Sequence, residues 1–327
     1  MGSPVPAAYG FDEDPATWRL LRARPPRPAL DWAAEALGGG TVTAVRALRG
    51  GLASAVHLLT VDQRVRVVLR RYVRPEVNLE EPEIARWEAR ALRFVAAVEL
   101  PTPTLLAVDA TGTAAGVPAV LMSRLPGRVE WSPPHRDRWL LRLAEQLPPI
   151  HAAPLPLPGA GTRADGAGAE AGNGAASIRP FAPYRQDRYE LPAWARWPAV
   201  WARAVDWFHR PTPPDAGPAV FVHRDYHPGN VLWRRGRVTG VVDWASASIG
   251  PAVVDVGHCR GNLFPYGLAV ADRFTAHWER QSGARYHPWA DIVTIIGDLD
   301  GLRDDPRPAS ERRLVEDALA RAVAELG

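Results

Sequence analysis

A polar loop held between two short apolar strands constrains this chain more than any other stretch. The apolar residues 220–222 predict a strand, and residues 231–233 resume the strand pattern after the loop. Between them lie Asp225 and Asn230, five positions apart. Because strands hold the loop at both ends, we expect Asp225 and Asn230 to share one end of a small sheet.

A tight hairpin then returns the chain to the same place. Residues 234–237 (Arg-Arg-Gly-Arg) predict a turn whose glycine adopts positive φ, and residues 238–242 form the returning strand. The hairpin brings Asp243 back beside Asn230. Two carboxylates and one amide would then meet, a hard-oxygen set that suits Mg²⁺ and leaves Asp225 as a base.

These motifs resemble those of the kinase superfamily. His223 to Asn230 match its H-R-D-x-x-x-x-N loop letter for letter. Asp243-Trp244, in place of D-F-G, is similar to the aminoglycoside phosphotransferase branch. So is the segment 249–255, although Pro251 stands where that branch usually has its first Asp. The chain is therefore identified as a member of the aminoglycoside phosphotransferase family.

The resemblance implies an α+β, two-lobed, protein-kinase-like fold. Its N-terminal lobe would hold an antiparallel sheet with one helix, and its larger C-terminal lobe would be mainly helical. We expect a nucleotide-binding lobe in residues 1–125 and a catalytic and substrate lobe in residues 126–327. Composition predicts disorder in residues 1–15 and a mobile insertion in residues 158–177, which carry almost no large apolar side chain.

A glycine-rich turn, residues 49–54, joins predicted strands at 41–48 and 55–61. Uncovered backbone N–H groups in such a turn can lie over phosphates. Ser54 would then touch a phosphate oxygen. An ordinary hairpin turn explains the same residues.

The next strand, residues 65–70, overlays the kinase strand that carries a phosphate-binding lysine. Arg70 stands in the place of that lysine. The chain contains no lysine, so all 39 basic side chains are arginine and any phosphate contact made by a cation falls to arginine. Arg70 is the predicted phosphate cation, and Arg71 on the opposite face is the alternative.

A helix is predicted over residues 83–98, with Glu88 on its apolar stripe. A buried carboxylate needs a cationic partner, and the resemblance supplies one in Arg70. A surface glutamate at the edge of the stripe is the alternative. The resemblance further implies a hinge at residues 123–127, where the Ser123 carbonyl and the Leu125 amide would bind adenine.

Phosphoryl transfer depends on positioning and charge neutralisation. By resemblance, Asn230 and Asp243 would hold Mg²⁺ against the phosphates of ATP, while Arg70 steadies the α- and β-phosphates. Asp225 would accept the proton of the substrate hydroxyl.

Neighbouring side chains would support this loop. His223 is expected to be scaffold, and Asp255 is expected, by resemblance, to hydrogen-bond the catalytic loop from a helix behind it. His227 would either contact a phosphate or pack the loop. His151 reads as a structural histidine.

The acceptor side is less defined. The aspartates between residues 291 and 305 could form a pocket for a polycation, or simply a solvated helix face. Trp194, Trp197 and Trp201 could pack in the core or form a stacking wall for a sugar ring.

Composition excludes several classes of protein. The 39 basic residues are interspersed with 36 acidic ones without a basic block, so nucleic acid is not an expected partner. No run of 18 apolar residues and no signal peptide is present, so we expect no membrane association and a cytoplasmic location. The single cysteine, Cys259, reads as a small core residue.

The predicted function is therefore ATP-dependent O-phosphotransfer to a hydroxylated small molecule, either an aminoglycoside-type antibiotic or a related metabolite. A catalytically weak nucleotide-binding pseudokinase or regulatory module is the alternative, favoured by the missing lysine. A protein kinase is disfavoured because neither D-F-G nor A-P-E is present.

Overall fold

The computed structural model describes residues 15–48, 53–155, 178–184, 188–303, 305 and 307–327. The predicted disordered segment 1–15, apart from its last residue, lies outside the described residues. The predicted insertion at 158–177 lies entirely outside them.

The N-terminal half is built on a five-stranded antiparallel sheet of order β1-β2-β3-β5-β4. Along β2, buried residues alternate with half-exposed ones, as expected for a strand with one face in a core. In β3, Arg70 lies opposite Val56 of β2 and Val120 of β5, at the centre of the sheet. The strands are β1 (Val42–Ala47), β2 (Ala55–Val61), β3 (Val65–Arg71), β4 (Leu105–Asp109) and β5 (Ala119–Ser123).

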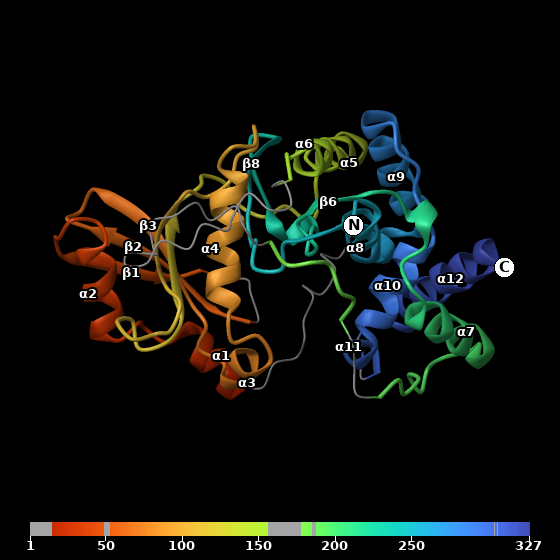
Figure 1. The fold of residues 1–327 in the computed structure, drawn as a ribbon, viewed down its shortest axis with the longest axis horizontal. Helices are drawn as coiled ribbons and strands as arrows, with labels where there is room; N and C mark the ends of the chain where they lie inside the picture. The colour runs from red at the N-terminus through yellow and green to blue at the C-terminus, as the bar shows by residue number, and fades with distance from the viewer. Residues whose placement is uncertain (1–14, 49–52, 156–177, 185–187, 304, 306) are drawn as a thin grey trace, which may run out of the picture.

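Helices cover both faces of this sheet. Helix α2 (Arg27–Glu35) packs on the outer face, and α4 (Ile84–Val95) lies between the sheet and the rest of the molecule (Figure 1). Two shorter helices, α1 (Pro15–Arg22) and α3 (Pro75–Glu80), lie beside them. The apolar stripe of α4 is buried and includes Glu88, which is 1% exposed. This stripe faces the side of β3 that carries Arg70.

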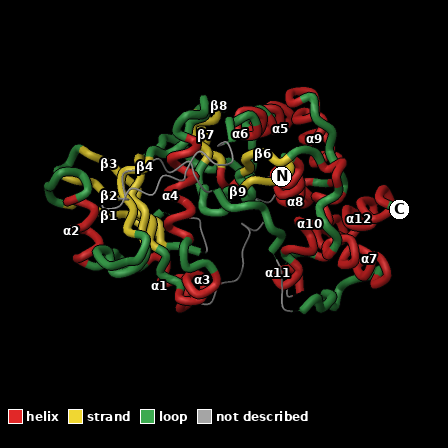
Figure 2. Tube along the Cα trace, in the orientation of Figure 1, coloured by secondary structure: helices red, strands yellow, loops and turns green. Residues whose placement is uncertain are grey.

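The C-terminal half is mainly helical, as Figure 2 shows. Its central helix α8 packs against α10, and Gly257 permits the close approach because a Cβ there would lie 2.6 Å from the Ala290 carbonyl oxygen. The antiparallel sheet of the N-terminal half and the helices of the C-terminal half confirm the predicted two-lobed α+β fold class. The helices are α5 (Arg136–Ala144), α6 (Leu147–His151), α7 (Pro198–His209), α8 (Val253–Leu263), α9 (Leu268–Ser282), α10 (Trp289–Gly297), α11 (Leu299–Arg303) and α12 (Ala309–Leu326).

Two small antiparallel ribbons lie where the two halves meet. Strand β7 (Val231–Arg234) pairs with β8 (Arg237–Val241), and the turn between them has positive φ at Arg235 and Gly236, as expected of a two-residue hairpin turn. Strand β6 (Ala219–Val222) pairs with β9 (Ser248–Pro251). The sequence did not predict β9, because Gly250 and Pro251 are both disfavoured in strands. Pairing with β9 fixes the strand that enters the polar loop.

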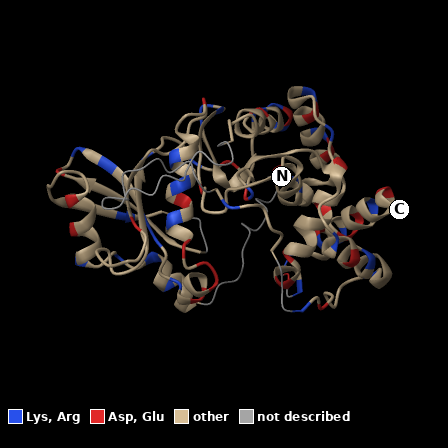
Figure 3. Cartoon of the chain, viewed as in Figure 1, with Lys and Arg blue, Asp and Glu red and all other residues tan. Residues whose placement is uncertain are grey.

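Figure 3 shows basic and acidic residues on both halves of the molecule. None of the described helices is both long enough and apolar enough to cross a bilayer.

Candidate active site

Helix α8 holds the loop of residues 223–230 from behind. The carboxylate of Asp255 is fully buried and accepts hydrogen bonds from the backbone N–H of His223 at 3.0 Å and of Arg224 at 2.6 Å. His151 donates from Nε2 to the same carboxylate at 2.9 Å. Arg224 has a φ of 68°, a costly conformation for a residue with a side chain. These hydrogen bonds fix the strained backbone next to Asp225.

The structure brings Asp225, Asn230 and Asp243 together. Asn230 donates from Nδ2 to the Asp225 backbone oxygen and to Asp225 Oδ2, both at 2.9 Å. The Val242 N–H donates to the Asn230 carbonyl at 2.9 Å, so Asp243 follows directly. His223 also donates from Nε2 to the Val242 carbonyl at 3.0 Å, which ties the loop to the end of the hairpin.

A buried charge network links this site to the sheet. Arg70 donates from Nη1 to Glu88 Oε1 at 2.6 Å, the ion pair that the family resemblance implied. It also donates from Nη1 and Nη2 to the two oxygens of Asp243, at 2.7 and 2.5 Å. Tyr72 donates from its hydroxyl to Glu88 Oε2 at 2.8 Å. Burial raises the pKa of Glu88, and the Arg70 charge opposes that rise.

Two histidines surround the Asp225 carboxylate. His258 Nε2 lies 2.9 Å from Asp225 Oδ1, and His227 Nε2 lies 3.8 Å from the same oxygen. Burial raises the pKa of Asp225, but these imidazoles and the His258 hydrogen bond outweigh it and hold that pKa well below its usual range. Sequence analysis missed His258. The available signal was its position three residues after Asp255, on the same helix face.

Asp225, His227 and His258 offer ligand atoms within 4.8 Å of one another, the composition of a transition-metal site. The hydrogen bonds oppose that assignment. The Gly229 N–H donates to His227 Nδ1 at 3.1 Å, so the neutral ring carries its proton on Nε2 and has no lone pair there for a metal. Burial lowers the pKa of His227 to about 4, which keeps the ring neutral at pH 7.

Asn230 and Asp243 fit Mg²⁺ better. The Asn230 amide nitrogen is used on Asp225, which leaves its Oδ1 as a hard ligand. Each carboxylate oxygen of Asp243 accepts one hydrogen bond from Arg70 and keeps a second lone pair.

The predicted phosphate-binding turn is only partly described, because residues 49–52 lie outside the described residues. Ser54 is buried, and its hydroxyl has no hydrogen-bond partner within the described part of the chain. Arg71, the alternative cation, is also buried, and its charge contributes to the lowered pKa of His57. Arg71 therefore lies in a different environment from Arg70.

The predicted hinge follows β5. Ser123 is the last residue of that strand, and its hydroxyl accepts a hydrogen bond from the Thr104 N–H at 2.8 Å. Leu125 covers Gly240 of β8 so closely that a Cβ on the glycine would lie 2.6 Å from Leu125 Cδ1. The hinge thus packs on the β7–β8 hairpin, whose second strand ends at Val241, two residues before Asp243.

The acidic residues between 291 and 305 do not form a free carboxylate pocket among the described residues. Asp291 is buried and accepts two hydrogen bonds from Arg260, both at 2.9 Å. Asp305 is buried against Arg307. Both predictions for this cluster, a cation pocket and a solvated face, are therefore wrong for these two aspartates. The other members are Asp298, which is exposed, Asp300, which pairs with Arg303, and Asp304, which lies outside the described residues.

The predicted tryptophan face packs against C-terminal helices. Trp201 is fully buried and donates from Nε1 to Glu316 at 3.0 Å, and Trp194 donates from Nε1 to the Leu302 carbonyl at 2.9 Å. Trp197 is 40% exposed. Core packing accounts for Trp194 and Trp201, so neither is placed to stack on a sugar.

Comparison with known proteins agrees with this geometry. The sequence model of the phosphotransferase enzyme family matches residues 44–290 of the 327-residue chain. No curated protein matches. Among solved structures, a thermostable variant of aminoglycoside phosphotransferase APH(4)-Ia, in complex with ADP and hygromycin B, is 19% identical. Its TM-score is 0.56, and the match covers 90% of this chain and 97% of that one.

Two further solved structures are similar. The macrolide 2′-phosphotransferase MphH from Brachybacterium faecium is 20% identical with a TM-score of 0.54, over 89% of this chain and 97% of that one. An aminoglycoside phosphotransferase homologue from Ralstonia eutropha is 16% identical with a TM-score of 0.53, over 88% of this chain and 92% of that one. At these identities the likeness establishes the fold.

Proposed function

Because the chain belongs to the phosphotransferase enzyme family, we propose that it transfers the γ-phosphate of ATP to a hydroxyl group of a small molecule. One observation carries the proposal. Asn230 bonds Asp225 through its amide nitrogen and neighbours Asp243 through the Val242–Asn230 backbone bond. A base and two hard-oxygen ligands therefore share one site, as in-line transfer to an alcohol requires.

Asp225 is the catalytic base of this proposal. Its carboxylate is 33% exposed, so an acceptor can reach it, while Asn230 and His258 fix its two oxygens. It takes the proton of the acceptor hydroxyl as that oxygen attacks the γ-phosphorus, the bond from this phosphorus to the bridging oxygen breaks, and ADP leaves. General-base help of this kind contributes about 10²- to 10⁴-fold.

Asn230 and Asp243 would hold Mg²⁺, which when bound would neutralise phosphate charge. Arg70, fixed by Glu88, would face the α- and β-phosphates in place of a lysine. The hinge backbone at Ser123 and Leu125 would receive adenine, and Ser54 would face a phosphate. The substrates in the related structures support a nucleotide and a hydroxylated acceptor, since APH(4)-Ia binds ADP with hygromycin B.

The acceptor is a hydroxylated molecule of the antibiotic or metabolite type. Two of the carboxylates considered for a polycation, Asp291 and Asp305, are already neutralised by Arg260 and Arg307, whereas Asp298 is exposed. The acceptor panel therefore includes macrolides, sugars and amino alcohols beside aminoglycosides.

The test is incubation of the purified protein with Mg-ATP and panels of aminoglycosides, macrolides, amino alcohols and sugars, with mass detection of an added phosphate. Asp225→Asn is the matched control. We expect one panel to yield a phosphorylated product, and Asp225→Asn to lose at least 100-fold in kcat while still binding ATP. Loss of ATP binding in this variant would give Asp225 a different role.

One observation favours a second candidate, a nucleotide-binding module without turnover. Arg70 occupies both oxygens of Asp243, a proposed metal ligand. Thermal stabilisation by Mg-ATP with no product from any panel would support this alternative.

A further inference from the structure

Helix α8 contacts the catalytic loop at two points one turn apart. Asp255 accepts hydrogen bonds from the backbone N–H groups of His223 and Arg224. His258 contacts the side chain of Asp225. The first contact fixes the backbone of the loop. The second contact acts on the side chain that the proposed function makes the base.

The direction of the second hydrogen bond follows from the chemistry of its partners. An ionised carboxylate only accepts, so His258 must donate from Nε2 to Asp225 Oδ1 across the 2.9 Å separation. Asn230 donates to the other oxygen, Oδ2, also at 2.9 Å. The carboxylate is therefore held at both oxygens, by two separate elements, and cannot rotate about its Cβ–Cγ bond without breaking one of these bonds.

The two donors have different tasks. Asn230 belongs to the loop, and its other amide atom, Oδ1, is the one proposed to bind the metal. His258 belongs to α8, where Cys259 beside it is fully buried and Gly257 packs against Ala290. The helix is a rigid support, since it cannot shift without disturbing that packing.

We propose that His258 is a positioning residue for phosphoryl transfer, holding the Asp225 carboxylate in the orientation that leaves a lone pair for the acceptor hydroxyl. This inference rests on the proposed function. A misplacement of about 1 Å at a reacting group can cost on the order of 10²-fold in rate. Loss of the His258 donor therefore lowers kcat without affecting the nucleotide site.

Three substitutions separate this role from a merely structural one. His258→Gln keeps an N–H donor near the position of Nε2, His258→Asn has an amide too short to reach it, and His258→Leu has no donor. We expect kcat to fall roughly 10- to 100-fold in His258→Leu and His258→Asn, with KM for ATP unchanged. His258→Gln should stay within about fivefold of the wild type, since it retains the hydrogen bond.

A double-mutant comparison completes the kinetic test. Adding His258→Leu to Asp225→Asn should cause no further loss, because the donor acts only through Asp225. Equal kcat in His258→Leu and the wild type, an equal loss in His258→Gln and His258→Leu, or additive losses in the double variant would each overturn the proposal.

A second readout does not need turnover and so separates the two proposals. The His258 ring should titrate at higher pH in the wild type than in Asp225→Asn, as followed by its Cε1–H NMR signal. An identical titration in both proteins would remove the contact on which the inference depends. A wild type that transfers no phosphate to any acceptor but shows the titration difference would overturn the proposed function, and with it the catalytic role of His258, while leaving the contact in place.

Discussion

Arg70 donates one hydrogen bond to each oxygen of Asp243, from Nη1 at 2.7 Å and from Nη2 at 2.5 Å. The same Nη1 donates to Glu88. A single guanidinium therefore bridges the helix–strand ion pair and a proposed metal ligand. A lysine ammonium could not bond both Asp243 oxygens in this planar geometry, so the replacement changes what the cation does.

Arg70→Lys should increase the apparent affinity for Mg²⁺. The lysine ammonium can keep the ion pair with Glu88 but cannot bond both oxygens of Asp243, so at least one of these oxygens becomes free to bind the metal. We expect the Mg²⁺ concentration for half-maximal transfer to fall several-fold at fixed ATP, and the thermal midpoint to fall by a few degrees because a buried charged hydrogen bond is lost. A Mg²⁺ titration of phosphate transfer and a thermal melt measure both.

Arg71→Lys is the matched control for this change, one position along the same strand. It should leave the Mg²⁺ titration unchanged, because Arg71 has no hydrogen bond to Asp243. Should Arg71→Lys weaken ATP binding while Arg70→Lys does not, the phosphate cation is Arg71.

Asp255→Asn should destabilise the protein and reduce transfer. The buried carboxylate accepts two backbone N–H groups of the loop, and an amide can present an acceptor oxygen to only one of them. We expect a loss of about 3 kcal/mol in the free energy of unfolding, measured by urea titration. Asp300→Asn, which removes an exposed pair with Arg303, should cost less than about 1 kcal/mol. Equal losses in the two variants would contradict a specific role for Asp255.

Local pattern predicted the elements that organise the site. Residues 231–241 form the expected hairpin because apolar alternation and Gly236 act within a few residues of one another. The helical stripe placed Glu88 in the core, and the family resemblance then implied its pairing with Arg70. Strand β9 was missed because its pairing with β6, and not its own composition, stabilises it.

Long-range partners could not be predicted in the same way. Asp291 was misinterpreted because its neutralising cation, Arg260, lies on another helix. The contact of His258 with Asp225 likewise joins residues 33 positions apart in the sequence. Periodicity places a side chain on a face but does not specify what covers that face. The lobe boundary and the roles of the site residues remain predictions.

Acidic pH should destabilise the protein through two buried histidines. Burial, with the charge of Arg71, lowers the pKa of His57 from 6.5 to about 4, and burial lowers that of His227 to about 4. Both rings stay neutral in the folded protein down to about pH 4, whereas in the unfolded chain they take up a proton below about pH 6.5. Protonation therefore favours the unfolded chain, and the folded protein loses stability as pH falls from 6.5 to 4. For each histidine, the resulting loss in the free energy of unfolding is up to about 3 kcal/mol.

His57→Leu tests this pH dependence away from the active site. Urea unfolding at pH 7.5, 6 and 5 should show a smaller decline in stability for the variant than for the wild type. An unchanged decline would mean that His57 does not titrate in this range.

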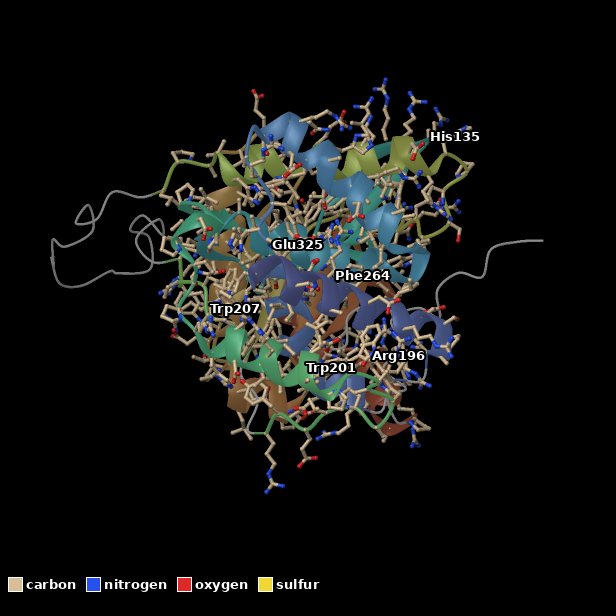
Figure 4. All side chains as sticks on the ribbon, turned by 90° about the vertical axis from the view of Figure 1, so that its right-hand side faces the viewer. His135, Arg196, Trp201, Trp207, Phe264 and Glu325 are labelled. Atoms are coloured by element: carbon tan, nitrogen blue, oxygen red, sulfur yellow. The ribbon has the colours of Figure 1, made fainter. Side chains whose placement is uncertain are left out.

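Glu316 anchors α12 to the start of α7. Its fully buried carboxylate accepts hydrogen bonds from the backbone N–H groups of Arg196 at 2.6 Å and Trp197 at 2.9 Å, and from Trp201 Nε1 at 3.0 Å. Figure 4 views this side of the molecule, with Arg196 and Trp201 near α12. The Arg196 side chain adds an ion pair at 2.7 Å.

Glu316→Gln should therefore lower stability without changing the chemistry of transfer. The amide turns an N–H toward donors that need an acceptor, and we expect a loss of about 3 kcal/mol in the free energy of unfolding. Asp317→Asn removes the neighbouring, partly exposed contact with Arg196 and should cost less than about 1 kcal/mol. The value of kcat, measured well below the unfolding temperature, should match the wild type in both variants, because Glu316 contacts none of the proposed site residues. A selective fall in kcat in Glu316→Gln would instead connect α12 to the catalytic loop.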